Sequence, residues 1–201
     1  MVVGVLALQG DIREHLLMLK DLKTKTLEVR LKEDLKEIDG LIIPGGESTT
    51  IGKLLKKYSL LKKIREMDKD GLPIYGTCAG MVLLAGKTSG FNQISLEIMD
   101  ITVKRNAFGR QRESFEADID IKTLKNPFHA IFIRAPVIEK AGKNVVVLAK
   151  FNKNIIMAKE GNLLVTSFHP ELSGDLRVHK IFLSMIKEYQ NKKHLRKEKA
   201  G

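Results

Sequence analysis

The single cysteine of the chain stands in a setting that favours nucleophilic chemistry. Cys78 lies between Gly76 and Gly80 in the segment GTCAG, after the apolar stretch LPIY. We expect a buried parallel strand to end here and a helix to begin, which is where ligands bind in open α/β sheets. The glycines allow the sharp turn of a nucleophile elbow, and a helix N-terminus favours the thiolate. The alternative is a small apolar residue in the core, as many cysteines are.

A nucleophilic thiol needs a base, and His169 is the best candidate for it. It follows the apolar stretch LLVTSF, which we expect to end at the same edge of the sheet as Cys78. In an extended chain residues i and i+2 project to one side, so Glu171 could accept a hydrogen bond from the second imidazole nitrogen. The remaining histidines have surface or packing explanations: His15, His129, His179 and His194. The HPE tripeptide alone is weak evidence, but together these residues predict a triad.

Acyl transfer also requires hydrogen-bond donors for an oxyanion, and the segment PGGES supplies candidates. Gly45 and Gly46 follow an apolar stretch, and glycine lets the backbone approach a substrate closely. The amide of Ala79, next to the expected nucleophile, is a further donor. A phosphate-binding turn is the alternative, but the segment lacks the lysine and the spacing of a Walker motif.

The elements that must position these turns alternate in the first half of the chain. Apolar stretches at 2–10, 41–43 and 72–80 predict buried strands, and 26–30 predicts a short one. Helical spacing follows the first of them, where Asp11 is expected to cap the helix 12–22, and recurs over 50–67 and from 81 onward. This alternation predicts a parallel sheet covered by helices on both sides.

Beyond about residue 100 the pattern changes to short strands, which predicts antiparallel hairpins added to the parallel sheet. The expected strands are 101–106, 114–121, 130–136, 145–151, 154–161 and 163–170. Asn152 to Asn154 read as a hairpin turn. A last amphipathic helix is expected over roughly 175–190, followed by a basic tail from about 191.

Composition limits the class of protein. With 201 residues, 43% of them apolar, the chain is expected to form one domain, 1–201. One cysteine excludes an internal disulfide and a Cys-based zinc site. We expect a cytoplasmic protein without a membrane span or signal peptide. The net charge of +11 is scattered over helix faces and the tail, and only 5% of the residues are aromatic, so no nucleic-acid partner is expected.

Taken together, PGGES, GTCAGM and SFHPE resemble the motifs of the class I, or triad, glutamine amidotransferases. The resemblance implies a three-layer, flavodoxin-like α/β fold with a mostly parallel central sheet and added antiparallel strands. The segments GVLALQG, PGGESTT, RNAFGRQRESFEADI, FIRAP and SFHPEL are more specifically similar to the glutaminase subunits of pyridoxal 5'-phosphate synthases. This similarity covers almost the whole chain, and RNAFGRQ is its most specific part.

The resemblance implies a role for each residue. Cys78 would attack L-glutamine and form a γ-glutamyl thioester, while His169 would move protons and Glu171 would orient it. Glutamine would be bound by the residues that match the family's substrate contacts: Gly46, Glu47, Ser48, Arg105, Ile133 and Arg134. An arginine and acidic or backbone acceptors suit the α-carboxylate and the α-ammonium of that substrate.

The resemblance also implies a partner, a synthase subunit that receives the ammonia. Gln9 matches a position near that interface, and the oxyanion turn would become correctly placed only when the partner binds. No cofactor and no metal is implied for the hydrolysis. The alternatives are the glutaminase subunit of another amidotransferase, a γ-glutamyl hydrolase, a cysteine peptidase and a silent binding subunit.

Overall fold

The computed structural model describes residues 1–105, 107 and 114–198. Its helices within that range are α1 (Ile12–Asp21), α2 (Ser48–Lys57), α3 (Leu60–Lys69), α4 (Ala79–Leu84) and α5 (Arg177–Glu198), with 3₁₀ turns at Asp34–Glu37 and Pro170–Leu172. Its strands are β1 (Val2–Leu6), β2 (Lys25–Val29), β3 (Gly40–Ile43), β4 (Ile74–Thr77), β5 (Ala85–Ser89), β6 (Met99–Lys104), β7 (Ser114–Ile119), β8 (Phe128–Ile133), β9 (Val137–Ala141), β10 (Val146–Phe151), β11 (Asn154–Glu160) and β12 (Leu163–Thr166).

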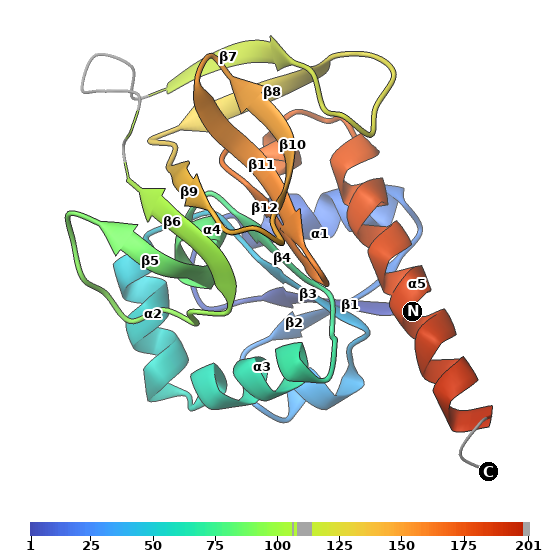
Figure 1. Cartoon of the computed structure of the whole chain (residues 1–201). Coiled ribbons are helices and arrows are strands. Elements are labelled where there is room, and N and C mark those ends of the chain that lie inside the picture. Colours follow the sequence, from blue (N-terminus) through green and yellow to red (C-terminus); the bar gives the residue numbers. More distant parts are fainter. Residues whose placement is uncertain (106, 108–113, 199–201) are drawn as a thin grey trace.

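The large sheet joins a parallel half to a mixed half, in which β12, β11, β9 and β6 pair antiparallel and the edge pair β6–β5 is parallel. Its strand order is β2-β1-β3-β4-β12-β11-β9-β6-β5, with β10 paired to β11. The strands from β2 to β12 are parallel, and antiparallel pairing begins between β12 and β11. Strands β7 and β8 form a separate antiparallel ribbon at the top of Figure 1. The expected fold, a mostly parallel sheet with added antiparallel strands, is confirmed.

Alternating strand residues divide the interior into two cores. Leu41 and Ile43 of β3 face the core beneath α2, α3 and α4, whereas Ile42 faces the core beneath α1 and α5. Because side chains alternate along a strand, each central strand is apolar on both faces. This explains why the sequence shows continuous apolar stretches and not an alternating pattern.

The expected helix over 50–67 is two helices, α2 and α3. Ser59 separates them and adopts a left-handed conformation with φ of 57°. The turn lets Leu55 at the end of α2 and Leu60 at the start of α3 bury their side chains in the same core. Periodicity alone predicts one helix, because both segments keep the same apolar spacing and neither glycine nor proline marks the break.

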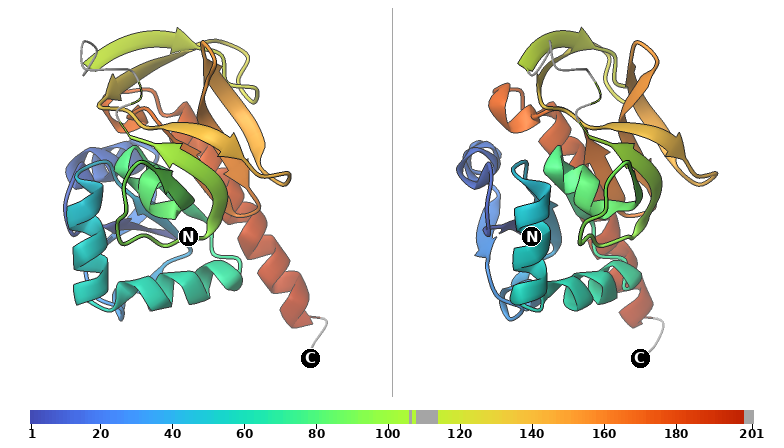
Figure 2. Two further views of the ribbon diagram at one scale, coloured as in Figure 1. Left: turned by 60° about the vertical axis from the view of Figure 1, so that its left-hand side comes forward. Right: turned by 90° about the vertical axis from the view of Figure 1, so that its left-hand side faces the viewer.

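The last helix is longer than expected. It continues to Glu198 instead of ending near Gln190. The apolar periodicity stops near residue 190, but lysine, arginine, leucine and glutamate are strong helix formers and no glycine or proline intervenes. In both views of Figure 2 the C-terminal end of α5 lies at the bottom of the molecule, at the far end from the β7–β8 ribbon. The basic tail is therefore helical as far as Glu198.

A polar cluster is buried between α1, α5 and the middle of the sheet. His15 Nδ1 lies 3.0 Å from His179 Nε2, and the hydroxyls of Tyr75 and Thr166 lie 3.0 Å apart. The rings of His15, Tyr75 and His179 have centroids 5.2 to 6.4 Å apart. Burial, with the neighbouring His179 and His169, lowers the pKa of His15 well below its usual value. Burial also lowers the pKa of His179 to about 4, so both imidazoles are neutral near pH 7.

We therefore expect the free energy of unfolding to fall as the pH is lowered from about 6.5 to 4. An unfolded histidine binds its proton near pH 6.5, whereas folded His179 does so only near pH 4, so acid favours the unfolded chain. The loss from His179 alone is about 2 kcal/mol between pH 7 and 5. Urea titrations across this range should show a smaller pH slope for His179→Gln than for the wild type, and equal slopes would contradict the assignment.

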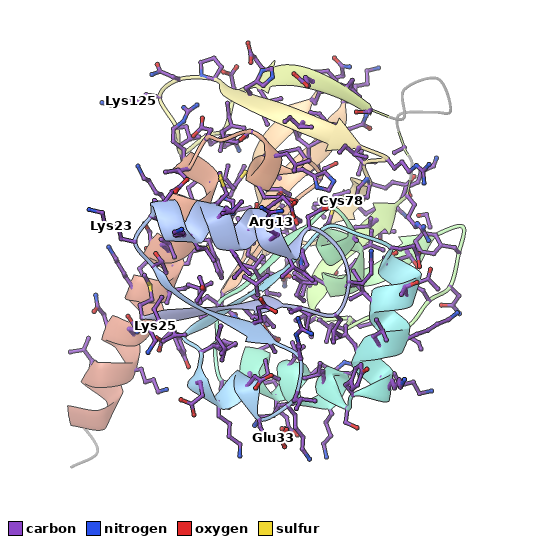
Figure 3. The ribbon with its side chains drawn as sticks, turned by 180° about the vertical axis from the view of Figure 1, so that it is seen from behind. Arg13, Lys23, Lys25, Glu33, Cys78 and Lys125 are labelled. Atoms are coloured by element: carbon purple, nitrogen blue, oxygen red, sulfur yellow. The ribbon has the colours of Figure 1, made fainter. Side chains whose placement is uncertain are left out.

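Charged side chains are distributed over the surface and not gathered at one place on the face drawn in Figure 3. Lys23, Lys25, Lys125 and Glu33 are all exposed and lie at different places on the face drawn in Figure 3. Within the described part of the chain, no helix combines the length and the apolar character needed to cross a bilayer.

Candidate active site

The turns singled out in the sequence meet at the carboxyl edge of the parallel strands. A cavity of about 350 Å³ opens there, and Cys78, which lines it, lies below the β7–β8 ribbon in Figure 3. The expected site residues that line it are Gly46, Glu47, Ser48, Cys78, Ala79, Arg105, Ile133, Arg134 and His169. Parallel strands end on one edge, so residues far apart in the chain meet at this point.

Cys78 occupies a strained elbow between β4 and α4. Its φ of 46° and ψ of −99° lie outside the regions that most residues adopt. Both neighbouring glycines are needed, because a Cβ at Gly80 would lie 2.1 Å from the Ile43 carbonyl oxygen, and one at Gly76 would lie 2.6 Å from the backbone of Gly80. The Cys78 N–H donates to the Thr166 carbonyl at 2.8 Å, so β12 holds the elbow in place.

His169 has one nitrogen between two carboxylates and the other free for proton transfer. Nδ1 lies 2.8 Å from Glu171 Oε1 and 3.2 Å from Asp11 Oδ2. Nε2 is buried and has no hydrogen-bond partner among the described residues. Burial opposes protonation of the ring, but the carboxylates of Asp11 and Glu171 and the nearby Cys78 sulfur outweigh it and raise the pKa of His169 to about 12. The imidazole is therefore protonated near neutral pH.

Glu171 reaches His169 by a route that differs from the expected one. The residues after His169 form the 3₁₀ turn Pro170–Leu172 and not an extended chain. The proline begins the turn, and the turn brings the Glu171 carboxylate back beneath the ring. The pairing is therefore produced by a tight turn, because the chain must leave the sheet edge at this point.

Asp11 is a site residue that the sequence reasoning missed. It was expected to cap α1, but its side chain makes no capping hydrogen bond. The carboxylate contacts His169 instead, and a Cβ at Gly45 would lie 2.6 Å from Asp11 Oδ2 and 2.5 Å from His169 Cε1. Its place just after the first strand, at the same edge as Cys78, was the signal that could have identified it.

A charged pair lies at the mouth of the cavity. Glu47 caps α2, and Arg105 Nη2 lies 3.7 Å from Glu47 Oε1. Partial burial opposes ionisation of Glu47, but hydrogen bonds from Thr50 and Thr49 outweigh it and lower the pKa of the carboxyl to about 2. The Arg105 guanidinium also lies 5.1 Å from the centre of the Phe91 ring. The cavity thus presents a fixed negative and a fixed positive charge side by side.

The remaining expected residues surround this pair. Ser48 is buried, and its hydroxyl donates to Gln93 Oε1 at 2.9 Å. Ile133 and Arg134 end β8, where the Ile133 carbonyl lies 3.7 Å from Cys78 Sγ and Arg134 has a φ of 45°. Of the RNAFGRQ motif, Asn106 and residues 108–111 lie outside the described residues.

Gln9 joins the first turn to the PGGES loop. Its Oε1 accepts a hydrogen bond from the Glu47 N–H at 2.7 Å, and the Gly45 carbonyl accepts one from the Asp11 N–H at 3.1 Å. In a planar trans peptide the N–H of Gly46 points away from that carbonyl, and so away from Asp11. The orientation of the Gly46 amide is therefore set by contacts to the Gln9–Asp11 turn.

The donor atoms of Asp11, His169 and Glu171 all lie within 4.8 Å of one another, which makes them the candidate metal ligands of the described residues. In this arrangement, however, both carboxylates face a single imidazole nitrogen. That geometry suits an oriented, protonated histidine beside a thiol.

Fold and site together define a triad glutamine amidotransferase. The chain belongs to the SNO glutamine amidotransferase family, whose profile matches residues 5–188. It is 55% identical over 184 residues to the pyridoxal 5'-phosphate synthase subunit PdxT of Pelotomaculum thermopropionicum, covering 91% of this chain and 94% of that protein.

One solved structure agrees with this assignment, and a second shares the fold. A crystal structure of a glutamine amidotransferase superposes with a TM-score of 0.90 at 46% identity, covering 93% of this chain and all of that one. A chain in the structure of PurLQS from Thermotoga maritima gives a TM-score of 0.66 at 15% identity, covering 91% of this chain and 97% of that one. The second similarity concerns the fold alone.

Proposed function

We propose that this protein is the glutaminase subunit of a cytoplasmic pyridoxal 5'-phosphate synthase. It hydrolyses L-glutamine to L-glutamate and ammonia, and a synthase subunit consumes the ammonia in vitamin B6 biosynthesis. The observation that carries the proposal is the single cavity that holds the Cys78 elbow, the His169 imidazole and the Glu47–Arg105 pair. Membership of the family supports it.

The first half of the reaction uses the protonated state of His169. The Cys78 thiolate attacks the side-chain amide carbon of glutamine, and the amides near Gly46 and Ala79 stabilise the oxyanion. The imidazolium then gives its Nε2 proton to the leaving nitrogen, and ammonia departs from a γ-glutamyl thioester. Glu171 and Asp11 hold the opposite nitrogen throughout, which fixes the direction of the ring.

In the second half, neutral His169 removes a proton from water. The resulting hydroxide attacks the thioester carbonyl, and glutamate leaves as the Cys78 thiolate is restored beside the imidazolium. One water is consumed for each glutamine, and no oxidant or further reactant enters the balance.

The charges at the cavity mouth suit an amino acid. The guanidinium of Arg105 can bind the α-carboxylate, and the carboxylate of Glu47 with the Ile133 carbonyl can accept hydrogen bonds from the α-ammonium. Because hydrogen bonds lower the pKa of Glu47 to about 2, its carboxylate is ionised near neutral pH.

Glutamate release is the measurement that tests the proposal, with and without a pyridoxal 5'-phosphate synthase subunit. We expect activity to rise strongly with the partner and this rise to shrink by about tenfold in Gln9→Ala, because Gln9 holds the Glu47 amide beside the oxyanion turn. Gln9→Glu, which keeps an acceptor oxygen, serves as the matched control. Equal activity with and without the partner would remove the switch, and peptide cleavage without glutamine hydrolysis would replace the proposal.

A further inference from the structure

One oxygen of Glu171 is not used by the histidine that the residue orients. Oε1 contacts His169, but Oε2 is buried without a hydrogen-bond partner among the described residues. The His15 imidazole lies beside it, with Nε2 3.6 Å from Oε2, and both side chains are fully buried. Burying a carboxylate oxygen without a hydrogen-bond donor costs free energy. It is therefore important whether the Nε2 atom of His15 carries a hydrogen or a lone pair.

The hydrogen positions on His15 follow from its neighbours. Its Nε2 faces Thr77 Oγ1 at 3.2 Å as well as Glu171, and its Nδ1 faces His179 Nε2 at 3.0 Å. If the proton were on Nδ1, the lone pair of Nε2 would point at the Glu171 carboxylate, and the lone pair and the carboxylate would repel each other. If the proton is on Nε2, its positive end faces both oxygens, and His179 supplies the N–H for Nδ1.

The second arrangement also fits the far end of the cluster. His179 Nδ1 is buried and has no partner within the described residues. With the proton on Nε2 of His179, Nδ1 of the same ring is an unpaired acceptor. This is the more favourable case, because buried N–H groups without a partner are rarer in proteins than buried acceptors without one. His179 therefore donates to His15, the Nε2–H of His15 faces one oxygen of Glu171, and the other oxygen of Glu171 accepts from His169.

We propose that His15 is a positioning residue for the triad, whose Nε2–H dipole holds the Glu171 carboxylate ionised and aimed at His169. At 3.6 Å the contact is longer than a hydrogen bond and acts as a dipole on a charge, strengthened by the low dielectric of the interior. The contact itself is read from the structure, whereas its effect on turnover rests on the proposed function.

Burial makes such support necessary. It raises the pKa of Glu171 above its usual value, against the hydrogen bond and charge of His169, so the ionised form needs every favourable dipole. The titratable groups that interact with the Glu171–His169 pair are Asp11 and His15 at α1, Tyr75 on β4 and Cys78 at α4, and His179 on α5 contacts His15. Among them, His15 is the one whose polar hydrogen can face Oε2.

The test compares three variants of the full chain. His15→Leu removes the dipole, and His15→Gln can place an amide N–H near the lost Nε2–H. Tyr75→Phe is the matched control, because it removes a buried hydroxyl of the same cluster, whose described hydrogen bond is to Thr166, and leaves the His15 Nε2–H in place. The rate of Cys78 alkylation by iodoacetamide is measured against pH, and kcat and KM for glutamine are measured in the complex with the synthase subunit.

We expect His15→Leu to move the acid limb of the alkylation profile upward by about one pH unit and to lower kcat roughly ten- to hundredfold, with KM changed less than about twofold. His15→Gln should recover most of both losses, and Tyr75→Phe should match the wild type. If His15→Leu does not fold, His15→Gln and His15→Asn give the same test, since the asparagine amide reaches only the Nδ1 position.

The positioning role would be overturned if His15→Leu had the same alkylation profile and the same kcat as the wild type. It would also be overturned if His15→Leu and His15→Gln lost equal amounts of both. A wild-type complex that does not hydrolyse glutamine would overturn the proposed function instead. The alkylation profile then still decides the role of His15, because it needs neither glutamine nor the partner.

Discussion

Replacing Cys78 by alanine is expected to lower glutamine hydrolysis in the assembled complex by about 10⁴-fold or more, because the nucleophile and the thioester are lost together. Cys78 is the one cysteine of the chain, and it faces His169 from a strained elbow, so no neighbouring thiol can replace it. Glutamate release over hours, compared with that of the wild-type complex, measures the effect.

Alanine should leave the fold intact, since Cys78 is small and its backbone N–H still bonds Thr166. Thermal unfolding and binding to the synthase partner are therefore expected to stay close to the wild type. A variant that retains more than about a hundredth of the activity would show that Cys78 is a packing residue and that the chemistry lies elsewhere.

The second prediction with a large expected effect distinguishes the roles of Glu171 and Asp11, the two carboxylates that contact Nδ1 of His169. We expect Glu171→Gln to lower kcat by about 10³-fold or more, because an amide can no longer stabilise the imidazolium or hold its proton in place. Glu171 is fully buried and lies 2.8 Å from Nδ1, so water does not screen its charge.

Asp11→Asn is the matched comparison and should cost only about tenfold, since a screened, longer contact contributes less. The Asp11 carboxylate is 35% exposed and lies 3.2 Å from the same nitrogen. Both variants change one carboxylate to an amide of the same size, so their difference reports charge and position. A larger loss for Asp11→Asn than for Glu171→Gln would make Asp11 the orienting residue of the site.

Much of the candidate site could be predicted because its signals are local. Gly76 and Gly80 flank Cys78 in the sequence and mark the elbow there, although the space that Gly80 leaves open is filled by the Ile43 carbonyl of β3. The apolar stretches before Gly45 and His169 likewise mark strands that end at one edge. Local turn residues and strand burial therefore indicate the turns at Gly45, Cys78 and His169, whereas Arg105, Ile133 and Arg134 were expected only from the family resemblance.

The misses share a different cause. Asp11 has the residue type and position of a helix cap, and only the approach of Gly45 and His169 turns its carboxylate toward the imidazole. His15 has the spacing of an ordinary helical residue, and only the packing of α5 places His179 against it. Such contacts join segments more than 150 residues apart, so no local pattern contains them.

By itself, the sequence determined the α/β alternation, the cysteine elbow and the turns that end at one edge of the sheet, because glycine-marked turns and buried apolar strands leave local patterns in the chain. The tertiary structure alone decided the break at Ser59, the second carboxylate on His169 and the buried histidine chain behind Glu171. These depend on which side chains meet after the sheet has closed and water has been removed, and the energies of burial and charge that set them exist only in the folded protein.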